Sequence, residues 1–252
     1  EAAVARVPWS RAEACIIPSG ESSAAQEAGI RVLSAERVIF NHLLVILRRN
    51  AAEFVGIQEV SGMIERLKQD RPDLVKALIP TQLTLQQVTE VLKHLLRERI
   101  PVRDLRLIFD SLARYAASTK DPATLAEYLR RDLRRLVCAR YSAGRGVLNY
   151  YALHPEIERM IQEAMVDTPA GPEVALSYDD QQRLIAGMEK AIDPRRHLSG
   201  EAVVLSAMPN VRRYLAHALE HVFPDVVFLA FQEIAPECVP NQIGIVTPGE
   251  GE

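Results

Sequence analysis

The segment HALEH, residues 217–221, has the spacing of the inverted zinc-protease signature H-x-x-E-H. In that signature two histidines bind the metal and the glutamate acts on the metal-bound water. A catalytic zinc site also needs a third protein ligand and a cleft. No third ligand stands near the motif, and His221 directly precedes VFPD, where an imidazole can cap helix carbonyls. Structural histidines are therefore favoured, and a zinc hydrolase stays open as an alternative.

Four arginines in RRDLRRLVCAR, residues 130–140, fall on two adjacent faces of one predicted helix: Arg130, Arg131, Arg134 and Arg135. Such a surface can contact a phosphate backbone. Leucine and valine occupy the opposite face, and nearby acidic residues dilute the charge, which favours a solvated or partner-facing surface. The net charge of −3 provides no overall field that attracts nucleic acid. An arginine-lined helical nucleic-acid-binding module is the alternative function.

The other candidate residues do not assemble a catalytic site. GRG at 144–146 is too short for a phosphate loop and follows a helix, and Ser206 lacks a G-x-S-x-G context. The three cysteines are odd in number and have no C-x-x-C spacing, which favours a reducing compartment. Apart from the zinc alternative at HALEH, these residues indicate no catalytic site and no cofactor.

The helices that position these residues are marked by their caps. Ser34 is a candidate N-cap for a helix over 35–50, and Thr84 with Gln87 forms a capping box for the next amphipathic helix. Pro101 suits the first turn of a further helix, and Asp121 with Pro122 should open a helix that continues to residue 141. The sequence thus predicts an all-α block that ends before the glycines at 144 and 146.

A different pattern follows residue 146. Apolar runs at 147–153, 202–207 and 226–231 alternate with amphipathic segments at 156–165, 179–192 and 209–221. Alternating strands and helices predict an α/β layer with at least one parallel crossover. Upstream, the short runs at 14–17 and 30–33 are candidate strands. We therefore expect an α+β protein of several subdomains: an α/β end with a linking helix at 1–50, a helical subdomain at 51–142, an α/β subdomain at 147–246, and a disordered tail at 247–252.

The helix within RERIPVRDLRLIFDSLARY, residues 97–115, carries a second pattern besides its apolar face. A stripe of charged residues lies opposite that face, with one large apolar residue at its edge: Arg103, Arg106, Asp110 and Arg114, beside Leu107. The apolar face suffices for a core, so the stripe faces either solvent or a partner.

Four segments together resemble the cytoplasmic part of the type III secretion export gate, the FHIPEP family of flagella and injectisomes. They are NHLLVILRRNAAEFVGIQEV (41–60), DLVKALIPTQLTLQQVTEVLKHLLRERIPVRDLRLIFDSLARYA (73–116), DPATLAEYLRRDLRR (121–135) and AHALEHVFPDVVFLAFQEI (216–234). FVGIQEV, DLVKAL and LAEYLRRDL are closer to the virulence injectisome branch. Because this family has no metalloprotease role, the resemblance disfavours the zinc alternative.

The resemblance implies a non-enzymatic part of a bacterial inner membrane protein, facing the cytoplasm and assembling into a nonameric ring. Transmembrane helices, most of a first subdomain and an inserted second one are expected to lie outside this sequence. Expected partners are chaperone–effector and chaperone–translocator complexes, a gatekeeper protein, and other export-apparatus and ATPase-complex stalk proteins, with no nucleic acid.

The resemblance also suggests two sets of site residues. The helical third subdomain makes ring contacts in this family, which assigns the stripe and its apolar neighbour to a subunit interface: Arg103, Arg106, Leu107, Asp110 and Arg114. The helix that matches 36–50 borders the chaperone cleft in flagellar members, which assigns partner binding to Asn41 and His42. Asn41 stands where a threonine is usual.

Overall fold

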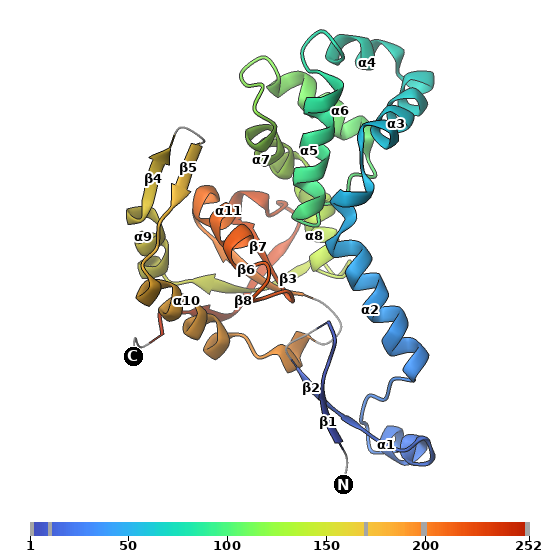
Figure 1. Ribbon diagram of the computed structural model, residues 1–252, viewed down its shortest axis with the longest axis vertical. Helices are drawn as coiled ribbons and strands as arrows, with labels where there is room; N and C mark the ends of the chain where they lie inside the picture. The colour runs from blue at the N-terminus through green and yellow to red at the C-terminus, as the bar shows by residue number, and fades with distance from the viewer. Residues whose placement is uncertain (1–2, 10–11, 169–170, 198–200, 250–252) are drawn as a thin grey trace.

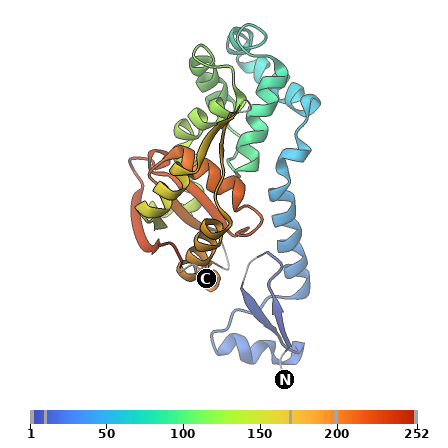
Figure 2. The same cartoon turned by 60° about the vertical axis from the view of Figure 1, so that its left-hand side comes forward.

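The computed structural model describes residues 3–9, 12–168, 171–197 and 201–249. The molecule is elongated, with a small hairpin near the N-terminus at one end and a group of helices at the other (Figures 1 and 2). A single long helix connects the two ends, and an α/β layer packs against the helical group (Figure 1). The α+β class with a helical block followed by an α/β block is confirmed.

The N-terminal part contains an antiparallel hairpin of β1 (Ala3–Arg6) and β2 (Glu13–Ile16), a 3-10 turn η1 (Ser19–Glu21) and α1 (Ser22–Glu27). The apolar run at 30–33 is not a strand, so that prediction is wrong. The connecting helix α2 (Ala35–Arg49) begins as predicted, because the Ser34 side chain accepts a hydrogen bond from the Arg37 amide.

The helical block contains η2 (Ala51–Phe54), α3 (Ile57–Asp70), α4 (Pro72–Leu78), α5 (Leu85–Arg97), α6 (Leu105–Tyr115), α7 (Pro122–Asp132) and α8 (Arg134–Tyr141). The Thr84–Gln87 capping box is confirmed at the start of α5. Pro101 lies outside α6, because Asp104 caps that helix instead by accepting from the Leu107 amide at 3.0 Å. The helix predicted from Asp121 onward is broken at Leu133, so α7 and α8 are separate.

The α/β block contains β3 (Val147–Leu153), α9 (Pro155–Glu163), β4 (Met165–Thr168), β5 (Gly171–Val174), α10 (Tyr178–Ala191), η3 (Pro194–His197), β6 (Ala202–Ser206), α11 (Pro209–Ala218), β7 (Val226–Ala230), η4 (Phe231–Glu233) and β8 (Val239–Val246). The four-stranded sheet has the order β7-β6-β3-β8 and every pair in it is parallel. The predicted crossover is therefore confirmed. Sequence patterns missed the β4–β5 hairpin and the edge strand β8.

Successive residues along the strands of the sheet belong to two different hydrophobic cores. Val203, Leu205 and Leu229 belong to the core that the helices α3 to α8 form, whereas Val204 and Phe228 belong to the core under α9, α10 and α11. This alternation follows from the two-residue period of a strand. The helical block and one face of the sheet consequently share a single hydrophobic core, although a sequence boundary separates them at 143–146.

The segment after β8 packs against α10. The Gly249 amide donates to the Arg183 carbonyl at 2.8 Å, and a Cβ atom at Gly187 would lie only 2.0 Å from the Thr247 carbonyl oxygen. Disorder predicted for the tail is therefore wrong for residues 247–249, while 250–252 lie outside the described residues. Across the described ranges, no helix combines the length and apolar character that crossing a membrane requires.

Candidate functional site

The charged stripe of α6 is mostly on the surface, as its sequence pattern predicts. Arg103, Arg106 and Asp110 are exposed, and Arg106 lies 3.9 Å from Asp110 as an i, i+4 pair. Such exposed pairs contribute only about 0–1 kcal/mol to stability. These three side chains are therefore available for contact with another molecule.

The other two residues of this set have intramolecular partners. Leu107 is half-buried and packs against the core of the helical block, so its place beside the stripe has an internal cause. Arg114 is exposed but donates to Asp132 on α7 at 2.8 Å and to the Ser111 hydroxyl at 3.0 Å. The structure thus holds Leu107 and Arg114 in place from within the molecule.

The surface of α2 is apolar on its outer face. Ile39, Phe40, Leu43, Ile46 and Leu47 are all exposed, with Ile39 at 69%. Their i, i+4 and i, i+7 spacing places them on one side of the helix. The described part of this chain leaves this face uncovered, because α2 has no buried residue.

Asn41 and His42 do not belong to this exposed apolar face. Both are half-buried, and at 100° per residue Asn41 falls on the same side as Val38 and Val45, which are also half-buried. His42 lies at the edge of the apolar face, one turn from Ile46. Helical periodicity in the sequence is a sufficient signal for the apolar face, whereas the family resemblance indicates only the polar residues of this helix.

Two arginines anchor the end of α2 to the α/β block. Arg49 and Arg99 both donate to the Pro224 carbonyl, at 3.2 and 3.0 Å. Arg99 also pairs with Glu201 at 3.1 Å. Burial, followed by the charge of Arg99, lowers the pKa of Arg49. Arg49 thus joins the end of α2 to the same carbonyl that Arg99 contacts from the helical block.

A buried ion cluster joins the helical block to the α/β block. Its members come from the residue after α5, from α7, from α11 and from η4: Glu98, Glu127, Arg130, Arg212 and Glu233. Arg130 is 1% exposed and donates to both carboxylate oxygens of Glu233 at 2.7 Å, and to Glu98 at 2.7 Å. Arg212 is fully buried and pairs with Glu98 and Glu127.

The cluster shifts the pKa values of its members in opposite directions. Burial alone would lower the pKa of Arg130, but the charges of Glu233 and Glu98 raise it instead. Burial raises the pKa of Glu127, against the opposing charge of Arg212. Burial also favours a raised pKa for Glu98, yet Arg130 and Arg212 hold it below its usual value. The carboxylates of Glu233 and Glu98 therefore stabilise the charged form of Arg130.

This cluster corrects the prediction of a solvated or partner-facing arginine surface at 130–140, which is wrong for Arg130. Because α7 and α8 are separate helices, the four arginines also do not share one continuous face. Arg135 pairs with Glu237 at 2.7 Å. Nucleic-acid binding through this segment is therefore disfavoured, because Arg130 is buried and the four arginines do not lie on one straight helix.

The HALEH motif does not form a one-turn pair of ligands, because α11 ends at Ala218 and His221 lies beyond it. His217 is exposed on α11. In the part of the chain that the structure describes, no three His, Cys, Asp or Glu side chains gather as a possible metal-ligand set.

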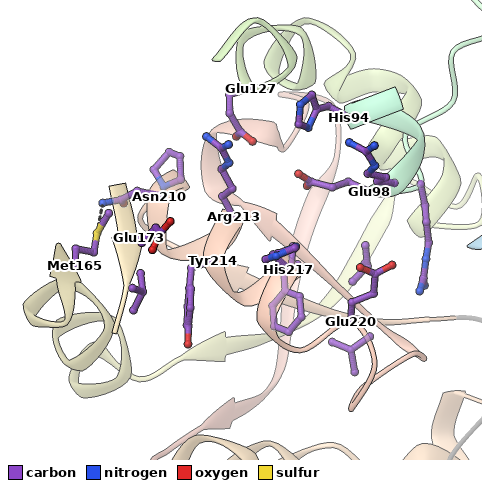
Figure 3. A pocket seen from close by; sticks show the side chains of 18 residues that line it. His94, Glu98, Glu127, Met165, Glu173, Asn210, Arg213, Tyr214, His217 and Glu220 are labelled. Atoms are coloured by element: carbon purple, nitrogen blue, oxygen red, sulfur yellow. Dashed lines mark hydrogen bonds between the residues drawn. The ribbon is translucent and has the colours of Figure 1, made fainter. Parts of the chain in front are cut away.

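A cleft of about 800 Å³ lies between α5, α11 and the β4–β5 hairpin (Figure 3). His94 and Glu98 approach it from the α5 side, while Arg213, Tyr214 and His217 approach from α11 (Figure 3). Sequence patterns do not reveal this cleft, because its lining comes from residues near 94–99, from Met165, Glu173 and Val174, and from residues near 215, and no local pattern connects them.

Comparison with known proteins agrees with this architecture. The sequence pattern of the FHIPEP family matches residues 2–239, nearly the whole chain. This chain belongs to the FHIPEP family. Among curated FHIPEP relatives, the flagellar biosynthesis protein FlhA of Bacillus subtilis is 29% identical over 86% of the chain, and the invasion protein InvA of Salmonella typhimurium is 31% identical over 88%. The chain spans about a third of the length of each, 32% in both cases.

Solved structures share the fold. The Chlamydia pneumoniae CdsV protein is 35% identical, with a TM-score of 0.80 over 92% of this chain and 66% of its own. A complex of CdsV with CdsO superposes with a TM-score of 0.79, over 92% of this chain and 68% of that one. The nonameric EscV cytosolic domain from the type III secretion system is 30% identical, with a TM-score of 0.75 over 90% and 67%. The described fold is thus that of FHIPEP cytosolic domains.

Proposed function

We propose that this FHIPEP chain is a non-enzymatic, ring-forming part of a type III protein export gate, and that it docks proteins for ordered export. The observation that carries the proposal is the fold shared with the nonameric EscV cytosolic domain. We assign the chain to the virulence branch on the segments FVGIQEV, DLVKAL and LAEYLRRDL, because the identities of 29% to FlhA and 31% to InvA are too similar to separate the two branches. The whole protein is then an inner membrane protein whose present portion faces the cytoplasm.

The ring interface is proposed to include the α6 stripe. Arg103, Arg106 and Asp110 supply the exposed charges, and Leu107 and Arg114 hold the edge of that surface in place. Exposed pairs are individually weak, so the interface depends on repetition at every junction of a closed ring. Subunits are therefore expected to associate at high concentration or when tethered to a membrane, where the effective concentration rises.

The docking surface is proposed to include α2. His42 borders its exposed apolar face, Asn41 lies on the neighbouring half-buried side of the helix, and an apolar face with a polar edge suits chaperone–cargo complexes and a gatekeeper protein. The CdsV–CdsO complex supports a further contact with other export-apparatus and ATPase-complex stalk proteins.

The ring proposal is tested by reversing two charges of the stripe, Arg103→Glu together with Arg106→Glu. Sedimentation and negative-stain electron microscopy of the concentrated protein should show loss of nonamers, with an unchanged circular dichroism spectrum and melting temperature. Arg134→Glu with Arg145→Glu, at two exposed positions outside α6, makes the same change in net charge and should leave the rings intact. Rings that persist in the Arg103/Arg106 variant would place the stripe in solvent.

A further inference from the structure

The cleft between α5, α11 and the β4–β5 hairpin has the size of a binding site. Its volume of about 800 Å³ falls within the usual range of ligand sites in proteins. Along its floor, α11 and the turn after it supply Asn210 to Glu220, a span of about 15 Å for a helical rise of 1.5 Å per residue. A segment of a few residues fits along this floor.

One side of the cleft carries two arginines that form no ion pair with a described carboxylate. Arg97 and Arg213 line it and are exposed, and within the described residues neither has a carboxylate at ion-pair distance. By contrast, the neighbouring Arg99 and Arg212 pair with glutamates. Burial, followed by the charges of Arg97 and Arg213, lowers the pKa of His94 between them. Three basic groups therefore line this side of the cleft, and the nearby Glu98 forms its ion pairs with Arg130 and Arg212 rather than with Arg97 or Arg213.

Carboxylates lie at the other sides of the cleft. Glu173 is on the β4–β5 hairpin and Glu220 follows the end of α11, on opposite sides of the α11 floor (Figure 3). Glu98 and Glu127 also reach the cleft but are held by Arg130 and Arg212. A polyanion such as a nucleic acid would meet carboxylates on both sides, so the charge pattern disfavours it.

We propose that this cleft binds a short segment of a partner protein with acidic residues at its middle and basic residues toward its ends. The acidic residues pair with Arg97 and Arg213, since a guanidinium binds a carboxylate through two parallel hydrogen bonds. The basic ends face Glu173 and Glu220. This inference goes beyond the proposed function, because it uses none of the ring or α2 residues.

Apolar contacts supplement this charge pairing. Met165 and Val174 from the hairpin and Tyr214 from α11 are half-buried at the cleft. An apolar side chain of the partner, next to its central acidic residues, would cover these three side chains of the cleft. The expected occupant is therefore amphipathic, and a free carboxylate ion alone should bind weakly.

The experiment uses two fluorescent twelve-residue peptides with this chain, followed by fluorescence anisotropy. The first has two glutamates and a leucine at its centre and a lysine near each end; the second exchanges glutamate and lysine. The first peptide should bind, and the second should bind at least about tenfold more weakly, because charge-assisted hydrogen bonds are lost.

Paired variants test the residues. Arg97→Gln with Arg213→Gln should weaken binding of the first peptide about tenfold or more. Arg97→Glu with Arg213→Glu should reverse the preference between the two peptides. Arg134→Glu with Arg145→Glu is the matched control for net charge, and thermal melting checks that each variant is folded.

The pH dependence offers a second measurement. A bound carboxylate next to His94 favours the protonated imidazole, so binding should tighten as the pH falls toward 6. The charged groups around this imidazole are Arg97, Glu98 and Glu90 of the α5 region and Arg213 of α11. His94→Gln should remove most of that tightening while the variant still binds the acidic-centred peptide at pH 8.

Three results would overturn the proposal. The first is that the two peptides bind equally well or that neither binds. The second is that the Arg97→Gln, Arg213→Gln variant binds the first peptide with unchanged affinity. The third is that a single-stranded oligonucleotide binds more tightly than the peptide and displaces it. The last result would assign the cleft to nucleic acid instead. Ring formation is measured separately, so its loss or persistence does not affect this outcome.

Discussion

Replacing Arg130 by methionine should be among the most destabilising single changes in this protein. Arg130 makes three hydrogen bonds of 2.7 Å to Glu233 and Glu98. In the parent, Glu233 is 2% exposed, and its other cationic partner among the described residues is Arg212 at 3.8 Å, so Arg130→Met leaves this buried carboxylate with that distant partner. The cluster changes from two cations and three carboxylates to one cation and three. Removing one partner of a buried pair costs about 3–5 kcal/mol, and we expect a loss of that size in the free energy of unfolding.

The double variant Arg130→Met with Glu233→Met separates this explanation from simple loss of packing. It removes the stranded carboxylate together with its partner and restores the cluster to one cation and two carboxylates. Replacing a complete buried pair by apolar residues of similar volume is often neutral. The double variant should therefore recover at least half of the loss, although Glu233 also accepts a weak hydrogen bond from the Ala230 amide.

Urea unfolding followed by circular dichroism measures both variants against the parent protein. Arg130→Lys is the conservative control, which keeps the charge but not the bidentate geometry, and it should lie between the parent and Arg130→Met. The reasoning fails if Arg130→Met unfolds within about 1 kcal/mol of the parent, a typical loss for an unremarkable substitution. It also fails if the double variant is less stable than the single one.

Three further predictions concern a buried carboxyl, the C-terminal segment and α2. Folding raises the pKa of Glu127 above 4.5, so the Glu127 carboxyl stabilises the folded protein fully below pH 4.5 and loses this contribution as the pH rises through the folded-state pKa. The difference in unfolding free energy between the parent and Glu127→Gln should therefore fall from pH 4 to pH 8, as measured by urea unfolding. Gly187→Ala should release residues 247–249 from α10, since the new Cβ would meet the Thr247 carbonyl at 2.0 Å; faster amide hydrogen exchange there is the measurement, and unchanged exchange would contradict the close packing. Asn41→Asp and His42→Ala should each weaken binding of a cognate chaperone–cargo complex to the full cytoplasmic portion without lowering its melting temperature, and unchanged affinity in both would remove these residues from the docking surface.

Local signals in the sequence predicted most of the elements that have them. The caps at Ser34 and Thr84 were identified because a cap is a contact across three residues. Strands β3, β6 and β7 were identified because the strands of a parallel sheet that is covered on both faces read as apolar runs. Strand β8 was missed because its residues are mostly exposed at the sheet edge, and polar positions interrupt its apolar ones.

The functional surfaces depended on contacts that the sequence does not display. Arg130 looks like a surface arginine because Glu233, its partner, lies 103 positions away. The same holds for Arg97 and Arg213, which converge only after the sheet has packed on the helical block. Leu107 is the opposite case, since it looked exposed on a helical wheel and became half-buried through packing against the shared core.

The junction between the two blocks explains how the proposed surfaces can act together. One hydrophobic core extends from the helices into the sheet, and the five-membered ion cluster crosses the same junction. Separating the blocks would expose that core and leave buried charges unpaired, which is costly. The α6 stripe and the cleft are therefore carried by a single body, and α2 is tied to that body through Arg49 and Arg99 at the Pro224 carbonyl. It follows that a partner held in the cleft would be fixed in orientation relative to the α6 surface, so each subunit of a ring would present its bound segment at the same angle to the ring.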